Sequence, residues 1–396
     1  MANVSSSNGL EKRPALSFRD ACGREFPSWH RTTLGTIIEP YSEKVHGEHD
    51  FEVLTSSREG LQRQIDHFGS QQRHDTDGYN IIPLGFCTYR NRSDDGRFTF
   101  NINKISDKAI VSKFYPVFRF KNANSTFMTE YLNSSARARK KLSVLAVGTS
   151  QVVLSFEALK SAKFDLPCKE EQDKIASLLE CLNERVELQR SFVDALKKYK
   201  RGLLSNLFGE KITQGCTTKS YYFSEIAQRR SEKYDPTSGI EYPCVELENI
   251  EQETGKILST VPSTAQSSIK NIAKSGDTLF GKLRPYLRKY AFAQKTMACS
   301  SEIWALIPSD AVLPKFLFYL VQTEQFLRVA NISSGTKMPR AEWSNIEKTE
   351  FFIPDPFVQR KVVSLLEGLD QKITFADSAL FSLNRLKASL MQQLFI

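Results

Sequence analysis

Two stretches of the chain carry a long apolar stripe with helical spacing. Alternating steps of four and three residues run from Ile175 to Leu207, and again from Val362 to Leu394. A stripe held for more than four heptads predicts a long helix with a coiled-coil seam. The predicted helix-pair seam consists of Ile175, Leu179, Leu182, Val186, Leu196, Leu203, Leu207, Val362, Leu366, Leu369, Ile373, Leu383, Leu390 and Leu394.

The two stripes belong to a repeated segment. Residues 164–208 align with residues 351–395 at a constant offset of 187, without a gap. Roughly a third of the positions are identical, against about one in twenty by chance, which indicates a tandem duplication. Two matched stripes in one chain favour packing of the helices against each other. Packing of each helix on its own globular core stays open as the alternative.

The predicted helices are long enough to act as a spacer. About 38 residues at 1.5 Å each would span roughly 57 Å. Lys200 and Lys387 occupy the same seam position in the two copies. We expect both lysines to extend their ammonium groups to solvent, although a role in fixing the register of the pair is the alternative.

Each predicted helix follows a segment of mixed character. Short strand-like runs include residues 80–84, 114–120, 277–280 and 302–307, and helical patterns cover residues 126–134 and 314–329. The predicted fold class is α+β, with two mixed α/β globular domains separated by two long antiparallel helices that form a coiled coil. The predicted divisions are an N-terminal segment 1–28, a first domain 29–163, a central helix 164–209, a second domain 210–350 and a C-terminal helix 351–396.

The two predicted domains differ in sequence, whereas the helices match. This contrast suggests two adapters that recognise two different targets, although ordinary drift of surface-rich segments gives the same picture. The formal net charge of +9 favours a polyanionic partner. Arginine can read guanine edges and asparagine adenine edges, and both can contact phosphate.

Clusters of basic and aromatic residues occur in both predicted domains. A single such cluster is more often a solvated surface, so the prediction of DNA contact depends on the set as a whole. Lys337 and Arg340 follow a Gly335-Thr336 turn whose backbone N–H groups suit a phosphate. The candidate DNA-binding residues are Tyr89, Arg90, Asn91, Arg92, Arg229, Arg230, Lys282, Arg284, Tyr286, Arg288, Lys289, Lys337 and Arg340.

No catalytic, metal or cofactor motif stands out in the sequence. There is no Gly-rich nucleotide-binding fingerprint, no Cys-x-x-Cys pair and no convincing acid–base set among the five histidines. We therefore predict no catalytic residue, no metal and no cofactor on this chain. No stretch approaches 18 apolar residues, and the scattered cysteines suit a reducing, cytoplasmic location.

The starts of the two helices carry a repeated signature. The first copy has Pro167 with Glu171-Gln172-x-x-Ile175, and later Leu203-Leu204-x-x-Leu207-Phe208. The second has Gln359-x-x-Val362 and Leu365-Leu366-x-x-Leu369-Asp370, with Val358 where Glu is usual. Over essentially the whole chain, this order of domains and helices resembles the specificity subunits of Type I restriction–modification enzymes. The segment Pro14–Phe18 with Trp29 is similar to the start of some members, although Ser17 stands where Arg is common.

The resemblance implies a non-catalytic DNA-recognition subunit. Each globular domain would be a target-recognition domain that reads one half of a bipartite site, and the antiparallel helices would set the spacer between the halves. The helices would also dock two methyltransferase subunits, which would carry S-adenosylmethionine and methylate adenine. A motor–nuclease subunit would join the complex for cleavage. The alternatives are a self-sufficient DNA methyltransferase or nuclease, and a coiled-coil scaffold that binds protein.

Overall fold

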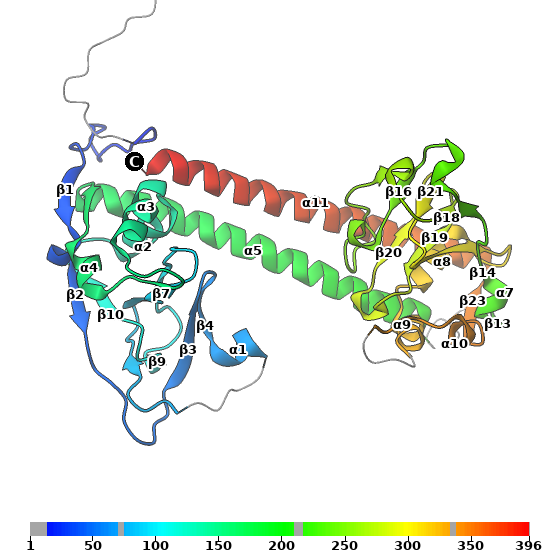
Figure 1. The fold of residues 1–396 in the computed structure, drawn as a ribbon, viewed down its shortest axis with the longest axis horizontal. Coiled ribbons are helices and arrows are strands. Elements are labelled where there is room, and N and C mark those ends of the chain that lie inside the picture. The colour runs from blue at the N-terminus through cyan, green and yellow to red at the C-terminus, as the bar shows by residue number, and fades with distance from the viewer. Residues whose placement is uncertain (1–13, 70–74, 210–216, 333–337, 396) are drawn as a thin grey trace, which may run out of the picture. The chain divides into compact units, whose positions relative to one another are not determined.

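The chain forms two compact units in the computed structural model, which describes residues 14–69, 75–209, 217–332 and 338–395 (Figure 1). Unit 1 consists of Met1–Gln189 and Ala379–Ile396, and unit 2 consists of Arg190–Ser378. Two long helices contribute to both units: α5 (Lys169–Phe208), drawn in green, and α11 (Pro356–Leu394), drawn in orange to red.

Unit 1 is built on two small four-stranded sheets. The first has the order β2-β10-β6-β8 and is antiparallel throughout, and the second has the order β4-β3-β9-β5 with one parallel pair, β3 with β9. Two further antiparallel pairs join β1 to β12 and β7 to β11. The strands are β1 (His30–Thr33), β2 (Ile38–Tyr41), β3 (Glu52–Ser57), β4 (Gly60–Arg63), β5 (Asn80–Ile81), β6 (Cys87–Tyr89), β7 (Arg92–Ser93), β8 (Phe100–Ile102), β9 (Ala109–Val111), β10 (Val117–Phe120), β11 (Val152–Val153) and β12 (Lys163–Leu166). The short helices are α1 (Gln64–Phe68), α2 (Ser125–Ser134), α3 (Ala136–Leu145) and α4 (Phe156–Ser161).

Unit 2 has its own pair of sheets. One has the order β14-β22-β19-β20, the other has the order β15-β18-β21-β16-β17, and β13 pairs separately with β23. The strands are β13 (Thr218–Tyr222), β14 (Ala227–Arg229), β15 (Lys233–Tyr234), β16 (Pro243–Val245), β17 (Val261–Pro262), β18 (Lys270–Ala273), β19 (Thr278–Gly281), β20 (Tyr290–Phe292), β21 (Met297–Cys299), β22 (Ile303–Pro308) and β23 (Glu350–Pro354). The short helices are α7 (Phe223–Ile226), α8 (Pro314–Leu320), α9 (Glu324–Ala330) and α10 (Trp343–Ile346).

The two long helices join the core of each unit in opposite order. In unit 1, Leu179 near the start of α5 belongs to one core cluster with Leu394 at the end of α11. In unit 2, Leu204 near the end of α5 belongs to one cluster with Leu366 near the start of α11. The pair is therefore antiparallel, and the predicted α+β fold with two mixed domains and two long antiparallel helices is confirmed. Every predicted seam position is buried or half-buried.

The repeated segment begins with a strand rather than a helix. Residues 163–166 form β12 and residues 350–354 form β23, and the helices start only at Lys169 and Pro356. Proline disfavours helical geometry in the residue before it, so Pro167 keeps Leu166 out of α5 and Pro356 keeps Asp355 out of α11. The predicted helical stretch 314–329 is likewise two helices, because Thr323 caps a new helix with a hydrogen bond from the N–H of Phe326.

A buried glutamine fastens each globular part to its long helix. In unit 1, Gln172 accepts a hydrogen bond from the N–H of Asn124, the residue that caps α2, and donates to the carbonyl of Pro167. In unit 2, Gln359 accepts from the N–H of Leu313, which caps α8. Its amide donates to the carbonyls of Pro354 and Ala311. The glutamine of the repeated signature therefore has a structural role in both copies.

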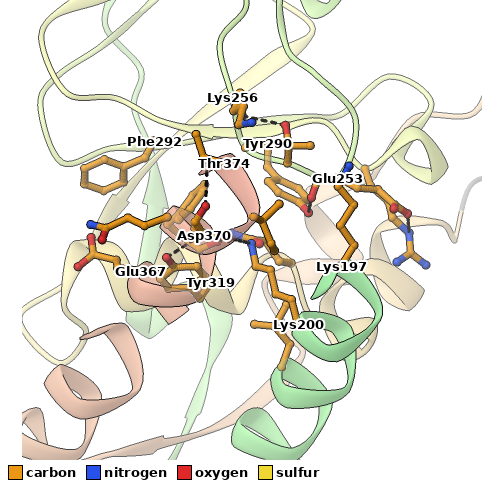
Figure 2. Close-up of a pocket in the computed structure, with 18 of the residues that line it drawn as sticks. Lys197, Lys200, Glu253, Lys256, Tyr290, Phe292, Tyr319, Glu367, Asp370 and Thr374 are labelled. Atoms are coloured by element: carbon orange, nitrogen blue, oxygen red, sulfur yellow. Dashed lines mark hydrogen bonds and ion pairs between the residues drawn. The ribbon is translucent and has the colours of Figure 1, made fainter. Parts of the chain in front are cut away.

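The expectation that Lys200 reaches solvent is wrong. Its ammonium lies 2.7 Å from Oδ1 of Asp370 and over the ring of Tyr319, and only 8% of its side chain is exposed (Figure 2). The Tyr319 hydroxyl donates to the other carboxylate oxygen of Asp370 at 2.9 Å. A buried ammonium needs such a partner, because removal from water is costly. Lys387, the equivalent residue in unit 1, is 29% exposed and lies 4.0 Å from Glu130.

Candidate nucleic-acid interface

Unit 2 contains a pocket whose described lining residues include four cations and no carboxylate. The pocket has a volume of about 500 Å³ and is called here the unit 2 basic pocket. It lies where β14, β15 and β22 meet the start of α10. Its lining residues are Ser224, Ala227, Gln228, Arg229, Arg230, Ser231, Lys233, Asn271, Lys282, Ser301, Trp304, Ala305 and Trp343. Three of the predicted DNA-binding residues, Arg229, Arg230 and Lys282, thus come together here.

Arg229 is the exposed cation of this pocket that rests on aromatic rings. Its guanidinium carbon lies 4.8 Å from the ring centre of Trp343 and 5.9 Å from that of Trp304. A cation over an indole face is attracted by the negative face of the ring. No carboxylate in the described part of the chain pairs with this guanidinium.

Arg230 and Lys282 have internal partners. Arg230 donates two hydrogen bonds to the buried carboxylate of Asp277, at 2.6 and 2.8 Å, and these bonds raise the pKa of the guanidinium. Lys282 lies 3.9 Å from Glu302, which also accepts hydrogen bonds from Arg340 at 3.1 and 3.2 Å. These cations contribute to the positive field of the surface, but their charges are partly neutralised within the protein.

The basic-aromatic loop 282–290 divides into exposed and engaged residues. Arg284 and Arg288 flank a single 3-10 turn with φ of 52° and 50°. Arg284 and Tyr286 are exposed, whereas Arg288 pairs with Glu324 at 2.8 Å and Lys289 donates to the carbonyl of Leu247. Of this loop, therefore, Arg284 and Tyr286 are the side chains free to meet a partner. Lys337 and the Gly335-Thr336 turn lie outside the described residues.

Unit 1 gathers a smaller cationic pocket, called here the unit 1 basic pocket. It has a volume of about 110 Å³ and is lined by Ser56, Ser57, Arg58, Arg90, Arg92, Ser93, Asp94, Arg97 and Thr99. Arg92 lies over the ring of Phe114, with its guanidinium carbon 5.3 Å from the ring centre. Arg58 bonds to Asp95 at 2.7 Å and Arg97 lies 3.9 Å from the same carboxylate. Arg90 and Arg92 are exposed.

Two predicted contacts of unit 1 are placed differently from the sequence expectation. Tyr89 is fully buried in β6, and its hydroxyl donates to the carbonyl of Leu154. Because the ring packs in the core against that of Phe100, Tyr89 is not available for a DNA contact, and that prediction is wrong. Asn91 is half-buried, and its side-chain oxygen has no hydrogen-bond partner among the described residues.

Sequence reasoning missed the aromatic residues that support the cations. Two of the three tryptophans of the chain line the unit 2 basic pocket, and Phe114 supports Arg92 in unit 1. The rarity of tryptophan could have drawn attention to these residues. That Trp304 lies beside Arg229, however, depends on the pairing of β14 with β22. Arg58 and Arg97 were also missed. Both lie outside the basic-aromatic run 89–92, and only the fold brings them to the same pocket.

A second pocket of unit 2 has a different character. It has a volume of about 530 Å³ and lies between α5, α8, α11 and residues 252–256 (Figure 2). Its cations are matched by acids: Lys200 with Asp370, Lys315 with Glu367, and both Lys197 and Lys256 with Asp377 at its edge. Within it, the Oε1 atom of Gln322 is buried without a hydrogen-bond partner in the described structure. Arg201 and Arg288 share Glu253, so each of the six described cations that line this pocket has an acidic partner and none is free for a polyanion.

No helix in the described part of the chain has the length and apolar character to cross a membrane.

Comparison with known proteins identifies the family. The sequence family described as "Type I restriction modification DNA specificity domain" matches residues 49–197 and 223–379, which is more than half of the chain. The chain therefore belongs to the family of Type I restriction–modification DNA specificity subunits. The sequence-based identification of the family is confirmed.

One relative is similar to this chain in sequence, and two solved structures are similar to it in fold. The chain is 26% identical over 198 residues to the Type I restriction enzyme HindI specificity subunit of Haemophilus influenzae, a match that covers 45% of this chain and 40% of that relative. It is similar in fold to the S subunit of a Type I restriction–modification system from M. genitalium, with a TM-score of 0.58, 16% identity, and coverage of 97% of this chain and 99% of that one. A second similar fold comes from a structure described as concerning complex assembly and conformational transition of the type I R-M system, with a TM-score of 0.55, 16% identity, and coverage of 94% and 98%.

Proposed function

We propose that this chain selects the DNA sequence for a Type I restriction–modification complex, with residues 29–163 and 210–350 each reading one half of a bipartite site. The observation that carries the proposal is a duplicated framework with two unlike basic pockets. The same glutamine fastens each globular part to its long helix, whereas the pockets of the two units differ in size and in most of their lining residues. A shared frame with different surfaces suits the recognition of two different sequences.

The DNA-binding residues follow from exposure and pairing. Exposed side chains without a carboxylate partner in the described structure are free to contact DNA, and these are Arg90 and Arg92 in unit 1 and Arg229, Arg284 and Tyr286 in unit 2. Residues that are bonded internally shape the surface and its field: Arg230, Lys282, Arg288, Lys289 and Arg340. Asn91 and Lys337 are retained from the sequence as contacts.

The long helices set the unread spacer in this proposal. Each is one continuous helix, of 40 residues for α5 and 39 residues for α11. Inserting one heptad after Val193 and another after Leu380 keeps the seam in phase and lengthens both helices by about 10 Å. The preferred spacer should then grow by about three base pairs, at 3.4 Å each. Methylome mapping of cells that carry the variant measures this, and an unchanged spacer would contradict the ruler role.

We also propose that the helices dock two methyltransferase subunits. Exposed apolar side chains occur at positions related by the repeat: Leu188 and Leu386 in unit 1 correspond to Phe375 and Tyr199 in unit 2. Apolar side chains exposed at equivalent places in both units suit a protein-binding surface, and repetition of that surface suits two copies of one partner. The partners would carry S-adenosylmethionine, a motor–nuclease subunit would join them for cleavage, and the complex would work in the cytoplasm.

A reconstitution experiment tests the proposal. The purified chain should form a stable complex with the methyltransferase encoded beside it, and this complex should methylate only a split site. Replacing residues 29–163 with those of another family member should change one half of that site and leave the other intact. Robust methylation or nicking by the chain alone would instead favour a self-sufficient enzyme. DNA affinity that does not fall with salt would favour a protein scaffold, because phosphate contacts release counterions.

A further inference from the structure

Each unit holds one exposed arginine on an aromatic support beside its basic pocket. In unit 2 this is Arg229 on Trp343 and Trp304, and in unit 1 it is Arg92 on Phe114. Neither guanidinium pairs with a carboxylate in the residues that the structure covers. The recurrence of the same pairing in two unlike pockets points to a shared task.

The support of Arg229 is rigid. Arg229 of β14 lies opposite Leu306 of β22, and Trp304, two residues along β22, therefore lies on the same face of the sheet. The two indoles contact each other edge to face, with centres 5.6 Å apart. Trp343 also packs on Phe223, which is fully buried in the core of unit 2. The arginine is thus held in position before any partner arrives.

The geometry of a ring-supported arginine selects its partner. The two rings lie beside the guanidinium, and its N–H groups make no hydrogen bond within the described structure, so they stay free to donate. A planar fork of this kind matches the O6 and N7 atoms of guanine in the major groove. A phosphate needs only positive charge, and in the same pocket the field of Lys233 and Lys282 supplies it.

We propose that Arg229 reads a guanine in the half-site of unit 2, and that Arg92 reads a guanine in the half-site of unit 1. The inference rests on the proposed function, because it requires that each unit contacts DNA bases. It adds the identity of one base in each half-site and the residue that reads it. It also separates these two arginines from the internally paired cations. Those cations add to the positive electrostatic field of the surface but not to the preference for a base.

The test uses the full chain in complex with its methyltransferase partner and a DNA library randomised in both half-sites. Domain exchange first assigns each half-site to its unit. Arg229→Ala should then lower the preference for one G·C pair in the unit 2 half-site by roughly 10- to 100-fold and leave the other half unchanged. Arg229→Gln should shift the preference at that position toward adenine. Arg92→Ala should act in the same way on the other half-site.

Arg119→Ala is the matched control. Arg119 also lies over a ring, that of Phe86, but it bonds to Glu39 at 2.6 Å. Its replacement should leave the base preference of both half-sites unchanged. Thermal melting of each variant confirms that it is folded, and the altered preference of Arg229→Gln is a readout that simple loss of stability would not produce.

Three results would overturn the inference. A half-site without any G·C pair leaves the arginine nothing to read. Equal weakening at all positions, with a shallower dependence on salt, would make Arg229 a phosphate contact. A change of base preference in Arg119→Ala would remove the distinction between free and paired arginines. The proposed function fails in a different way, namely when no split site is found or when domain exchange has no effect.

Discussion

The two units use one framework with different interiors at equivalent places. In unit 2, Lys200 of α5 pairs with Asp370 of α11, and Tyr319 of α8 bonds to the same carboxylate. In unit 1 the corresponding lysine, Lys387, lies 4.0 Å from Glu130, which also accepts a hydrogen bond from the amide of Asn183. Asn183 and Asp370 are related by the repeat offset, and Glu130 and Tyr319 each stand six residues after the cap of their helix.

This difference shows which contacts the two copies of the repeat keep and which contacts have diverged. The residues that fasten the frame, Gln172 and Gln359, keep their identity and their partners. The polar contact on the inner surface of the helices changes from Lys387 at 4.0 Å from Glu130, with 29% and 19% of the side chains exposed, to a buried Lys200 at 2.7 Å from Asp370, with 8% and 29% exposed. A buried pair is sensitive to the loss of either partner, whereas a half-exposed pair contributes little.

The largest effect is expected at the ion pair of the buried Lys200 ammonium. Asp370→Ala leaves this ammonium and the Tyr319 hydroxyl without their carboxylate partner inside unit 2, and should cost about 3 kcal/mol of stability, the low end for a buried pair because Asp370 is 29% exposed. Asn183→Ala at the equivalent position should cost only about 0.5–1.5 kcal/mol. Urea unfolding follows unit 1 in a background that keeps only Trp29, and unit 2 in a background that keeps only Trp304 and Trp343. Equal losses of stability in Asp370→Ala and Asn183→Ala would show that the two units do not differ at this position.

The fastening glutamines should rank next. Gln359→Met keeps the volume of the side chain but leaves the N–H of Leu313 and two carbonyls unpaired, and should cost unit 2 about 2–3 kcal/mol. Gln172→Met removes one fewer hydrogen bond and should cost unit 1 about 1–2 kcal/mol. The same tryptophan signals measure both, and a neutral Gln359→Met would show that the fastening role is wrong.

Alkaline pH should separate wild type from Tyr319→Phe. Burial and the neighbouring Asp370 raise the pKa of Tyr319 above its ordinary value. The folded chain therefore keeps this phenol protonated, while the unfolded chain ionises it above about pH 10. The contribution to stability is complete below that pH and is lost as pH rises, by at most about 1.4 kcal/mol per pH unit. The slope of unit 2 stability between pH 10 and 11.5 should be shallower in Tyr319→Phe, and an identical slope would contradict this account.

The smallest effect is expected at the start of α5. Lys169 is the first residue of α5 and pairs with Asp173, whereas the equivalent residue of α11 is Pro356. The substitution Lys169→Pro gives α5 the same first residue as α11. Proline suits the first helical position, and an exposed pair of this spacing contributes little, so unit 1 stability should change by less than about 0.5 kcal/mol. A loss above about 2 kcal/mol in urea unfolding would mean that the two helix starts are not equivalent.

The amino-acid sequence alone determined the long helices, their seam, the duplication and the family. These features depend on spacing along one helix and on identity between two segments, which are local properties of the chain. The sequence also indicated which residue types would form the basic surfaces. It could not tell the free cations from the paired ones, and it placed Tyr89 on the surface although the residue belongs to the core.

Only the tertiary structure decided which charges stay available. Arg229 and Arg230 are neighbours in the chain, yet one rests on two indoles and the other is bonded to Asp277. Lys200 and Lys387 share one place in the repeat, yet only Lys200 is buried against a carboxylate. The physical reason is that pairing and burial depend on groups that the sheets and helices bring together from distant segments, so an ionic or aromatic partner cannot be read from the pattern around a single residue.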